Sequence, residues 1–311
     1  MLPNPIIFSG TANQPFGQKI CDSMRLPLGD VAIKYFSDGE LWVKYNQNIR
    51  GADVFIIQPT NAPARNLLEL LIMIDAAKRA SAERITAVIP YYGYGRQDRK
   101  DQPRVAITAK LMADLLTTAG ANRILTMDLH APQIQGFFDI PLDHLYSAAV
   151  FADHFRDMNI PDLTVVSPDI GGITMARAYA KRLLAPLAII DKRRPKQNES
   201  VVMHIIGDVK DRNILIIDDI VDTAGTLCHA ADALKDKGAE KIFVACTHPI
   251  LSTKAIQRIA EAPISEIYVT DTVFLPNEKN IDKLHVLTAS KIFGDAINRI
   301  HGDESISSLF D

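Results

Sequence analysis

The stretch Ile214-Leu-Ile-Ile-Asp-Asp-Ile-Val-Asp-Thr-Ala-Gly-Thr226 decides the fold of this chain. Its first four residues are apolar and three of them are β-branched, which predicts a short buried strand. Asp218 and Asp219 follow the strand directly, and Asp222 opens a Thr-Ala-Gly-Thr turn. After the turn, apolar residues recur at helical spacing, at Leu227, Ala230, Ala231 and Leu234. The stretch therefore predicts a strand, a loop and a helix.

The loop after this strand suits a sugar phosphate. In an open α/β sheet, ligands bind at the carboxyl ends of the strands. Gly225 lets a ligand approach the backbone closely, and N–H groups and hydroxyls at the start of a helix hold a phosphate. Asp218 and Asp219 can accept hydrogen bonds from the vicinal hydroxyls of a ribose. The plainer alternative is an acidic surface loop in which Thr226 caps the helix, but the residue pattern favours the sugar phosphate. No Walker A sequence occurs in the chain.

The composition and the length of 311 residues are those of a soluble globular protein of roughly two domains, with 47% hydrophobic and 23% charged residues. A net charge of −3 gives no general attraction for nucleic acid. Three widely spaced cysteines, Cys21, Cys228 and Cys246, predict neither a disulfide framework nor a zinc site. The N-terminus lacks the pattern of a signal peptide, and the apolar runs are too short to cross a bilayer. We therefore expect a cytoplasmic protein with no membrane or nucleic-acid partner.

Strands and helices alternate along the chain, which predicts an α/β fold with mostly parallel sheets and helices on both faces. An internal echo indicates two domains of one fold. The strand at 54–57, an apolar helix and a strand at 85–90 match the strand at 214–217, its helix and a strand at 242–246. The first copy has Gln58-Pro-Thr-Asn61 where the second has its aspartates. We therefore expect the sugar-phosphate site in the second copy, with a boundary near residue 146 and domains of residues 1–146 and 147–311.

Further polar stretches stand at expected strand ends, where a site would be assembled. They are Asp128-Leu-His130, Ser167-Pro-Asp169, Arg96-Gln-Asp-Arg-Lys100 and Asp191-Lys-Arg-Arg194. The first two offer metal ligands, because Mg²⁺ needs only one or two protein groups. The two basic stretches could hold a nucleotide and close over phosphates. Taken singly, His130 is better explained as a structural histidine. The Arg96 stretch could equally be a solvated loop, and the Asp191 stretch could equally be the tip of a basic hairpin. Separately, Asp38-Gly39 between two apolar runs predicts a β-hairpin.

Together these stretches resemble the ribose-phosphate pyrophosphokinase family, whose product is 5-phosphoribosyl 1-pyrophosphate (PRPP). The resemblance runs nearly end to end and covers six motifs in the family's order: Phe36-Ser-Asp-Gly-Glu40, Arg96-Gln-Asp-Arg99, Asp128-Leu-His130, Ser167-Pro-Asp-Ile-Gly-Gly172, Lys192-Arg-Arg194 and Asp218 to Thr226. The last motif is similar to the PRPP motif of the type I phosphoribosyltransferase fold. The resemblance therefore implies two tandem domains of that fold, with the ATP-binding elements in the first and the ribose 5-phosphate site and catalytic loop in the second.

The resemblance also implies a reaction, in which the pyrophosphoryl group of ATP moves to the C1 hydroxyl of ribose 5-phosphate and gives PRPP and AMP for nucleotide biosynthesis. It implies that Lys192 and Arg194 act in the catalytic loop and that His130 and Asp169 hold Mg²⁺. The implied ATP-binding residues are Phe36, Asp38, Gly39, Glu40, Arg96 and Gln97, with the hairpin supplied by a neighbouring subunit of a homohexamer. The implied ribose 5-phosphate residues are Asp218, Asp219, Asp222, Thr223, Ala224, Gly225 and Thr226.

The chain departs from the family's pattern in one loop. Residues 99–106 form a shorter loop than is usual in bacterial relatives, and Ala106 stands where a proline is usual. Because this loop helps to form the family's regulatory site for phosphate and ADP, we expect weaker regulation by both effectors. Two alternatives stay open. A phosphoribosyltransferase that consumes PRPP would not need the ATP stretches. A non-catalytic regulator should have lost Lys192, Arg194 or the acidic motif, and a transcription factor would need a DNA-binding module.

Overall fold

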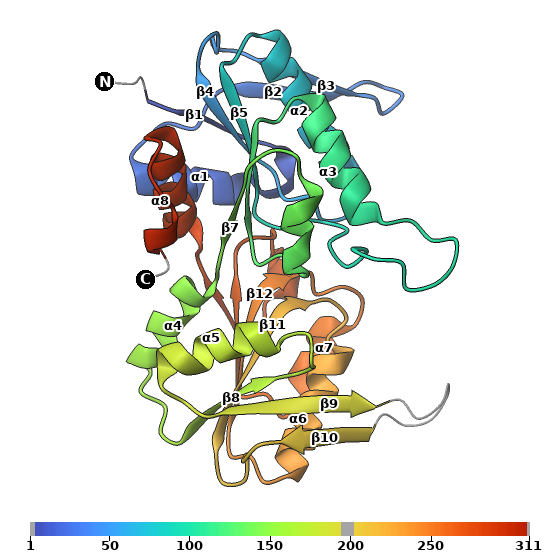
Figure 1. The fold of residues 1–311 in the computed structure, drawn as a ribbon, viewed down its shortest axis with the longest axis vertical. Coiled ribbons are helices and arrows are strands. Elements are labelled where there is room, and N and C mark those ends of the chain that lie inside the picture. Colours follow the sequence, from blue (N-terminus) through green and yellow to red (C-terminus); the bar gives the residue numbers. More distant parts are fainter. Residues whose placement is uncertain (1–3, 194–201, 310–311) are drawn as a thin grey trace. The chain divides into compact units, whose positions relative to one another are not determined.

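The computed structural model describes residues 4–193 and 202–309, and its contacts divide the chain into two units (Figure 1). The first unit contains residues 4–146, 272–274 and 289–309, and the second contains the remaining described residues. The elements of the first unit are β1 (Ile6–Ser9), α1 (Gln14–Met24), β2 (Val31–Tyr35), β3 (Leu41–Tyr45), β4 (Asp53–Ile57), α2 (Arg65–Arg79), β5 (Arg84–Ile89), α3 (Thr108–Ala119), β6 (Arg123–Met127), β7 (Leu142–Leu145) and α8 (Ser290–His301). Those of the second are α4 (Ala148–Asp157), β8 (Leu163–Ser167), α5 (Ile173–Leu183), β9 (Leu187–Arg193), β10 (Val202–Ile206), β11 (Asn213–Val221), α6 (Gly225–Asp236), β12 (Ile242–Pro249), α7 (Ala255–Glu261), β13 (Glu266–Thr270) and β14 (Leu284–Leu287).

The first unit is built on a parallel sheet with the strand order β1-β4-β5-β6-β7. Its inner strands β4, β5 and β6 are mostly apolar because helices cover both faces of the sheet. Val54 and Ile56 pack in one core with residues of α2 and α3. Phe55 and Ile57 point to the opposite face and are also fully buried, on the side where Figure 1 shows α1 and α8. The sheet is therefore the middle of three layers.

The hairpin that Asp38-Gly39 predicts is confirmed, because β2 and β3 pair antiparallel with Tyr35 opposite Leu41. Two short elements escaped prediction. Strand β7 reads Leu-Asp-His-Leu, so only half of its residues are apolar. Helix α7 has seven residues, which is too short for a clear helical period.

Helix α8 departs from the expected domain division, which placed residues 147–311 together. Its residues pack in the first unit instead. Phe293 meets Phe16 of α1 edge to face, with ring centroids 5.5 Å apart. An added Cβ at Gly294 would lie 2.5 Å from Ser23 Oγ, so the two helices touch closely. The physical reason is that α8 carries an apolar stripe that covers the α1 side of the first sheet.

A cluster of polar contacts among Asp53, Arg84 and His301 connects the end of α8 to the first sheet. Arg84 Nε and Nη2 donate to the two carboxylate oxygens of Asp53 at 2.9 and 2.5 Å. Arg84 Nη2 also donates to the carbonyl of Ile300 at 2.8 Å. His301 Nδ1 lies 2.8 Å from Asp53 Oδ2. The Asp53 side chain is only 13% exposed, so a single, largely buried carboxylate contacts both the Arg84 guanidinium and the His301 imidazole.

Replacing Asp53 by alanine should destabilise the first unit by about 2–3 kcal/mol. Arg84 then loses its buried carboxylate partner and keeps only the pair with the exposed Asp303, so the loss should be somewhat smaller than for a fully buried ion pair. Denaturant unfolding followed by the fluorescence of Trp42, the single tryptophan of the chain, measures this unit. The control is Asp75→Ala, whose pair with Arg79 is exposed and should contribute less than about 1 kcal/mol. Equal losses in both variants would contradict the prediction.

The second unit is built on a sheet with the strand order β10-β9-β8-β11-β12-β13-β14, which is parallel except at the β9–β10 pair. Ile214 and Ile216 of β11 pack in one core with α6, and Leu215 and Ile217 pack in another with α4 and α5. From β8 the chain moves outward to β9 and then returns to β11 on the other side of β8. The strand order therefore reverses between β8 and β11, and ligands bind at the carboxyl ends of strands at such a reversal.

The predicted fold class, an α/β fold with mostly parallel sheets between helices, is confirmed in both units. Within residues 4–193 and 202–309, no helix is long and apolar enough to cross a membrane. The three cysteines are all buried and unpaired, as their spacing predicts.

Candidate active site

The acidic pair lies inside a strand rather than in a loop. The apolar run was expected to end at Ile217, but β11 continues to Val221. Its pairing with β12 extends through Asp218 opposite Cys246 and Val221 opposite Pro249. The neighbouring strand supplies backbone hydrogen-bond partners, which outweigh the poor strand propensity of aspartate. Asp218 and Asp219 are consequently held on a rigid element.

Asp218 lies in strongly negative surroundings. Loss of hydration raises the pKa of its carboxyl well above the ordinary value, and the charge of Asp219, a hydrogen bond to it and the charge of Asp169 raise that pKa further. The backbone N–H of Asp219 donates to Asp218 Oδ1 at 2.9 Å, and this hydrogen bond lowers the pKa of Asp218. Asp169 follows β8 and Asp218 lies in β11, so the strand reversal brings together two acids that are distant in sequence. This corner of the sheet therefore favours a cation or hydroxyl donors.

The turn after β11 has a backbone that a non-glycine residue rarely adopts. Ala224 has φ 60° and ψ 4°, in the left-handed region, and it is the N-cap of α6. The helix begins at Gly225, so Thr226 lies within its first turn and is not the cap. An added Cβ at Gly225 would lie 3.7 Å from Arg258 Nη1 and 3.8 Å from Thr223 Oγ1, which are ordinary contacts. The protein's own packing does not require glycine here, which is consistent with a requirement set by a ligand.

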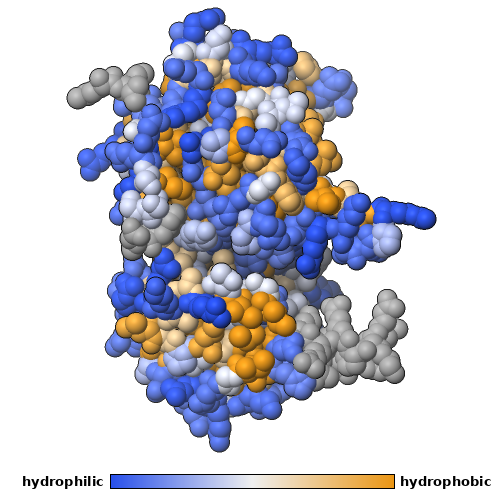
Figure 2. Space-filling view, in the orientation of Figure 1, coloured by the Kyte–Doolittle hydropathy of each residue, from blue (hydrophilic) through white to orange (hydrophobic). Residues whose placement is uncertain are grey.

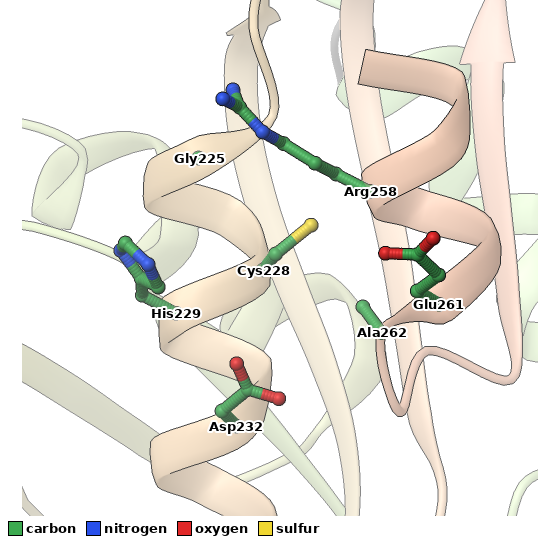
Figure 3. A pocket seen from close by; sticks show the side chains of 7 residues that line it. All are labelled: Gly225, Cys228, His229, Asp232, Arg258, Glu261 and Ala262. Carbon is green, nitrogen blue, oxygen red and sulfur yellow. The ribbon is translucent and has the colours of Figure 1, made fainter. Parts of the chain in front are cut away.

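A cavity of about 320 Å³ lies between α6 and α7, behind this turn (Figure 3). It is lined by Gly225, Cys228, His229, Asp232, Arg258, Glu261 and Ala262. In Figure 3, Arg258 extends from α7 towards the start of α6. Its Nη1 donates to the carbonyl of Thr223 at 2.8 Å. The Arg258 guanidinium therefore both lines the cavity and contacts the turn.

Asp169 caps the start of the segment that leads into α5. Its Oδ1 accepts the N–H of Gly172 at 2.8 Å, and the Ser167 hydroxyl donates to its carbonyl at 2.7 Å. Both bonds fix the turn, while the Asp169 side chain stays exposed. Ile170 beside it is 62% exposed, and Figure 2 shows apolar side chains gathered over α5 on this face of the unit. An acid and an apolar surface thus border the β8–β11 corner together.

In the first unit, the predicted ATP residues fall in two separate places. The hairpin tip is tightly turned, since Gly39 has φ 93° and Asp38 Oδ1 accepts the N–H of Glu40 at 3.0 Å. Phe36 at this tip is 56% exposed. Figure 1 shows the tip of β2–β3 well apart from the loop that joins β5 to α3, which carries Arg96 and Gln97.

Arg96 and Gln97 lie next to the segment of His130. An added Cβ at Gly95 would lie 3.8 Å from His130 Cβ. The Gln97 N–H donates to the carbonyl of Tyr94 at 2.9 Å, and the Thr108 hydroxyl donates to Gln97 Oε1 at 2.5 Å. Arg96, Gln97 and His130 are all exposed. The structure therefore brings these three residues together within the first unit, on the surface.

Of the two predicted catalytic cations, Lys192 and Arg194, the structure describes only the backbone of the first. Lys192 lies in β9 opposite Met203 of β10, and its side chain is not among the described ones. Arg194 lies outside the described residues. Sequence reasoning missed Ser252 and Arg258, both of which contact the turn. Neither stood at a predicted strand end beside a recognisable motif, so no local signal pointed to them.

The acids of the β8–β11 corner suit a magnesium ion that binds together with substrate. Within the described residues, no group of three or more His, Cys, Asp or Glu side chains forms a ready metal site. Asp169, Asp218 and Asp219 nevertheless offer carboxylate oxygens whose mutual repulsion a divalent cation would relieve. Mg²⁺ usually takes one or two carboxylates and completes its shell with waters and substrate phosphates. The donor set therefore fits Mg²⁺.

Comparison with known proteins accounts for both units. Residues 5–120 match the model of the N-terminal domain of ribose phosphate pyrophosphokinase, and residues 192–311 match that of the phosphoribosyl synthetase-associated domain. The chain is 58% identical to the ribose-phosphate pyrophosphokinase of Chlorobaculum tepidum, over 98% of this chain and 94% of that protein. The chain belongs to the ribose-phosphate pyrophosphokinase family.

Further members of the family agree. The ribose-phosphate pyrophosphokinase of Corynebacterium ammoniagenes is 52% identical, over 98% of this chain and 96% of that protein. The crystal structure of phosphoribosylpyrophosphate synthetase from Mycobacterium smegmatis superimposes with a TM-score of 0.91 at 37% identity. That likeness covers 97% of this chain and the whole of the other. The family identification from the motifs is therefore confirmed, and the chain is an enzyme of this family.

Proposed function

We propose that the chain transfers the pyrophosphoryl group of ATP to the C1 hydroxyl of ribose 5-phosphate, which gives PRPP and AMP. The observation that carries the proposal is the similarity to pyrophosphokinases over 98% of the chain, because it spans both the predicted ATP elements and the sugar-phosphate motif. A phosphoribosyltransferase that consumes PRPP would explain the second unit alone.

In the proposed reaction, the C1 oxygen of ribose 5-phosphate forms a bond to the β-phosphorus of ATP. The bond from that phosphorus to the oxygen bridging the α- and β-phosphates breaks, AMP leaves, and the hydroxyl proton passes to solvent. Positioning and cancellation of charge on the phosphoryl oxygens carry such a transfer. Mg²⁺ bound to the phosphates would neutralise part of that charge.

The residues of the second unit divide this work. Asp218 and Asp219 would accept hydrogen bonds from the ribose hydroxyls, and their place in a strand keeps the acceptors still. Residues 222–226 would receive the 5-phosphate at the start of α6, where backbone N–H groups and the helix dipole favour an anion. Asp169, with the acidic pair, would hold Mg²⁺, and His130 of the first unit is a further proposed ligand. Lys192 and Arg194 would neutralise the phosphoryl oxygens during transfer.

The decisive experiment is to incubate the purified protein with ATP and Mg²⁺, with and without ribose 5-phosphate, and to measure AMP. We expect AMP formation that depends on ribose 5-phosphate, with one PRPP formed per AMP. Absence of AMP would refute the proposal and favour a regulatory protein associated with the synthetase. That alternative is compatible with the match of residues 192–311 to the phosphoribosyl synthetase-associated domain.

We propose that ATP binds at Arg96 and Gln97 and that the hairpin tip of a second copy completes the site, as in a homohexamer. The separation of the tip from the Arg96 loop in Figure 1 supports a contribution from another copy. The exposure of Tyr35, Phe36 and Trp42 on the hairpin supports contact with a partner as well, because grouped apolar side chains mark interaction surfaces.

A mixture of two inactive variants tests this arrangement. Glu40→Ala and Lys192→Ala chains should each be nearly inactive alone. Mixed under conditions that exchange subunits, they should recover about a quarter of wild-type activity, since one site in four then combines two intact contributions. The control for exchange mixes wild-type chains with the double variant Glu40→Ala/Lys192→Ala, where exchange lowers the active fraction from about one half to about one quarter. A fully active monomer in analytical ultracentrifugation would rule the arrangement out.

Phosphate and ADP remain proposed effectors. The loop of residues 99–106 is exposed over most of its length, and Arg104 has φ 67°. Because the loop is short, it should reach fewer oxygens of a bound effector, so inhibition by ADP at saturating ATP should be weak.

A further inference from the structure

One segment supports the turn of residues 222–225 at successive positions. In the chain after β12, Leu251 N–H donates to the carbonyl of Val221 at 3.0 Å, and Ser252 N–H donates to that of Asp222 at 2.9 Å. The Ser252 hydroxyl donates to Asp222 Oδ1 at 2.5 Å. Arg258, one helical turn into α7, donates to the carbonyl of Thr223 at 2.8 Å. Each of residues 221–223 is therefore held from the same side.

The two side-chain contacts are of different kinds. The bond from Ser252 to the Asp222 carboxylate is charge-assisted, and such bonds are shorter and stronger than neutral ones. It fixes the side-chain rotamer of an acid that belongs to the proposed phosphate turn. The bond from Arg258 fixes a backbone carbonyl at the next residue, immediately before the left-handed Ala224. Its guanidinium also places positive charge beside the start of α6, where an anion would bind.

The turn needs such support because its backbone is strained. Ala224 has φ 60°, and on the supporting side Leu251 and Thr253 have φ 47° and 53°. Left-handed conformations cost a non-glycine residue roughly 1–2 kcal/mol each, and they persist where surrounding contacts hold them. Ser252 of the second segment and Arg258 of α7 each make a side-chain hydrogen bond to the turn.

We propose that Ser252 and Arg258 are positioning residues for ribose 5-phosphate, which hold residues 222–225 in the shape that receives the 5-phosphate. This inference rests on the proposed function and deepens it. Neither side chain needs to touch the substrate, and neither is proposed to act on ATP. Their loss should therefore weaken binding of ribose 5-phosphate and leave the phosphoryl transfer itself nearly intact.

The test compares Arg258→Ala, Arg258→Lys and Ser252→Ala with Gln257→Ala as a matched control. Gln257 stands next to Arg258 on α7 and bonds to Glu261, away from the turn. Each alanine variant at 252 or 258 should raise KM for ribose 5-phosphate about 3- to 10-fold, the effect of losing one hydrogen bond. The kcat and the KM for ATP should stay within about 2-fold of wild type. In Arg258→Lys, the lysine can still donate to the Thr223 carbonyl, so the KM for ribose 5-phosphate should return most of the way to the wild-type value.

A second readout does not depend on activity. Hydrogen exchange of the amides of residues 222–226 should be faster in Arg258→Ala than in the wild type or in Gln257→Ala, because the turn opens more often. An unchanged KM for ribose 5-phosphate together with unchanged exchange would overturn the positioning role. An equal rise of KM for both substrates would overturn it as well, since it would indicate general disorder. If the wild type makes no AMP, the proposed function fails, whereas the exchange result still decides whether Arg258 holds the turn.

Discussion

Replacing Lys192 by alanine should lower kcat by about two to three orders of magnitude, comparable to the loss of a group that stabilises charge in a transition state. The resemblance to the family assigns Lys192 to the catalytic loop, and β9 ends one residue later. A cation that acts on the phosphoryl oxygens during transfer contributes little to ground-state binding of the sugar. The KM for ribose 5-phosphate should therefore change much less than kcat.

Initial rates of AMP formation at saturating substrates measure this effect. Arg194→Ala should behave in the same way. Lys210→Ala is a suitable control, because Lys210 is an exposed lysine of the same unit that no predicted site includes. Wild-type turnover in both Lys192→Ala and Arg194→Ala would remove the catalytic role from this loop.

Replacing Asp218 by asparagine should impair function and stabilise the ligand-free protein together. Asparagine keeps the oxygen that accepts the Asp219 N–H, and it removes one of the negative charges that oppose each other here. The loss of an ionised acceptor for a ribose hydroxyl should weaken binding of ribose 5-phosphate about 10- to 100-fold. Isothermal titration calorimetry with ribose 5-phosphate measures that loss.

The gain in stability should depend on pH in a defined direction. Because the folded state raises the pKa of Asp218 above its ordinary value of 3.8, the folded protein retains a proton that the unfolded chain has released. Stability of the wild type therefore falls as the pH rises from the ordinary pKa to the raised one. Asp218→Asn lacks this decline, so its melting temperature should exceed that of the wild type at pH 8, and the difference should shrink as the pH falls. A lower melting temperature for the variant at pH 8 would contradict the repulsion.

The sequence alone determined the features that depend on neighbouring residues. The apolar runs and their periods predicted the alternating strands and helices, because each period reflects which side of an element is buried. Asp38-Gly39 predicted the β2–β3 hairpin, since glycine accepts the positive φ that the tip requires. The order of six short motifs was sufficient to recognise the family. Each of these signals is local, or is a series of local signals.

Only the tertiary structure decided the features that depend on partners distant in the chain. Strand β11 extends past its apolar run because β12 pairs with it, and α8 joins the first unit because α1 offers an apolar face. Asp169 acts on Asp218 across the β8–β11 reversal, although the two residues are 49 positions apart in the sequence. Ser252 and Arg258 reach the phosphate turn from beyond β12. No local pattern encodes these contacts, because the strand order of the folded sheet brings the segments together.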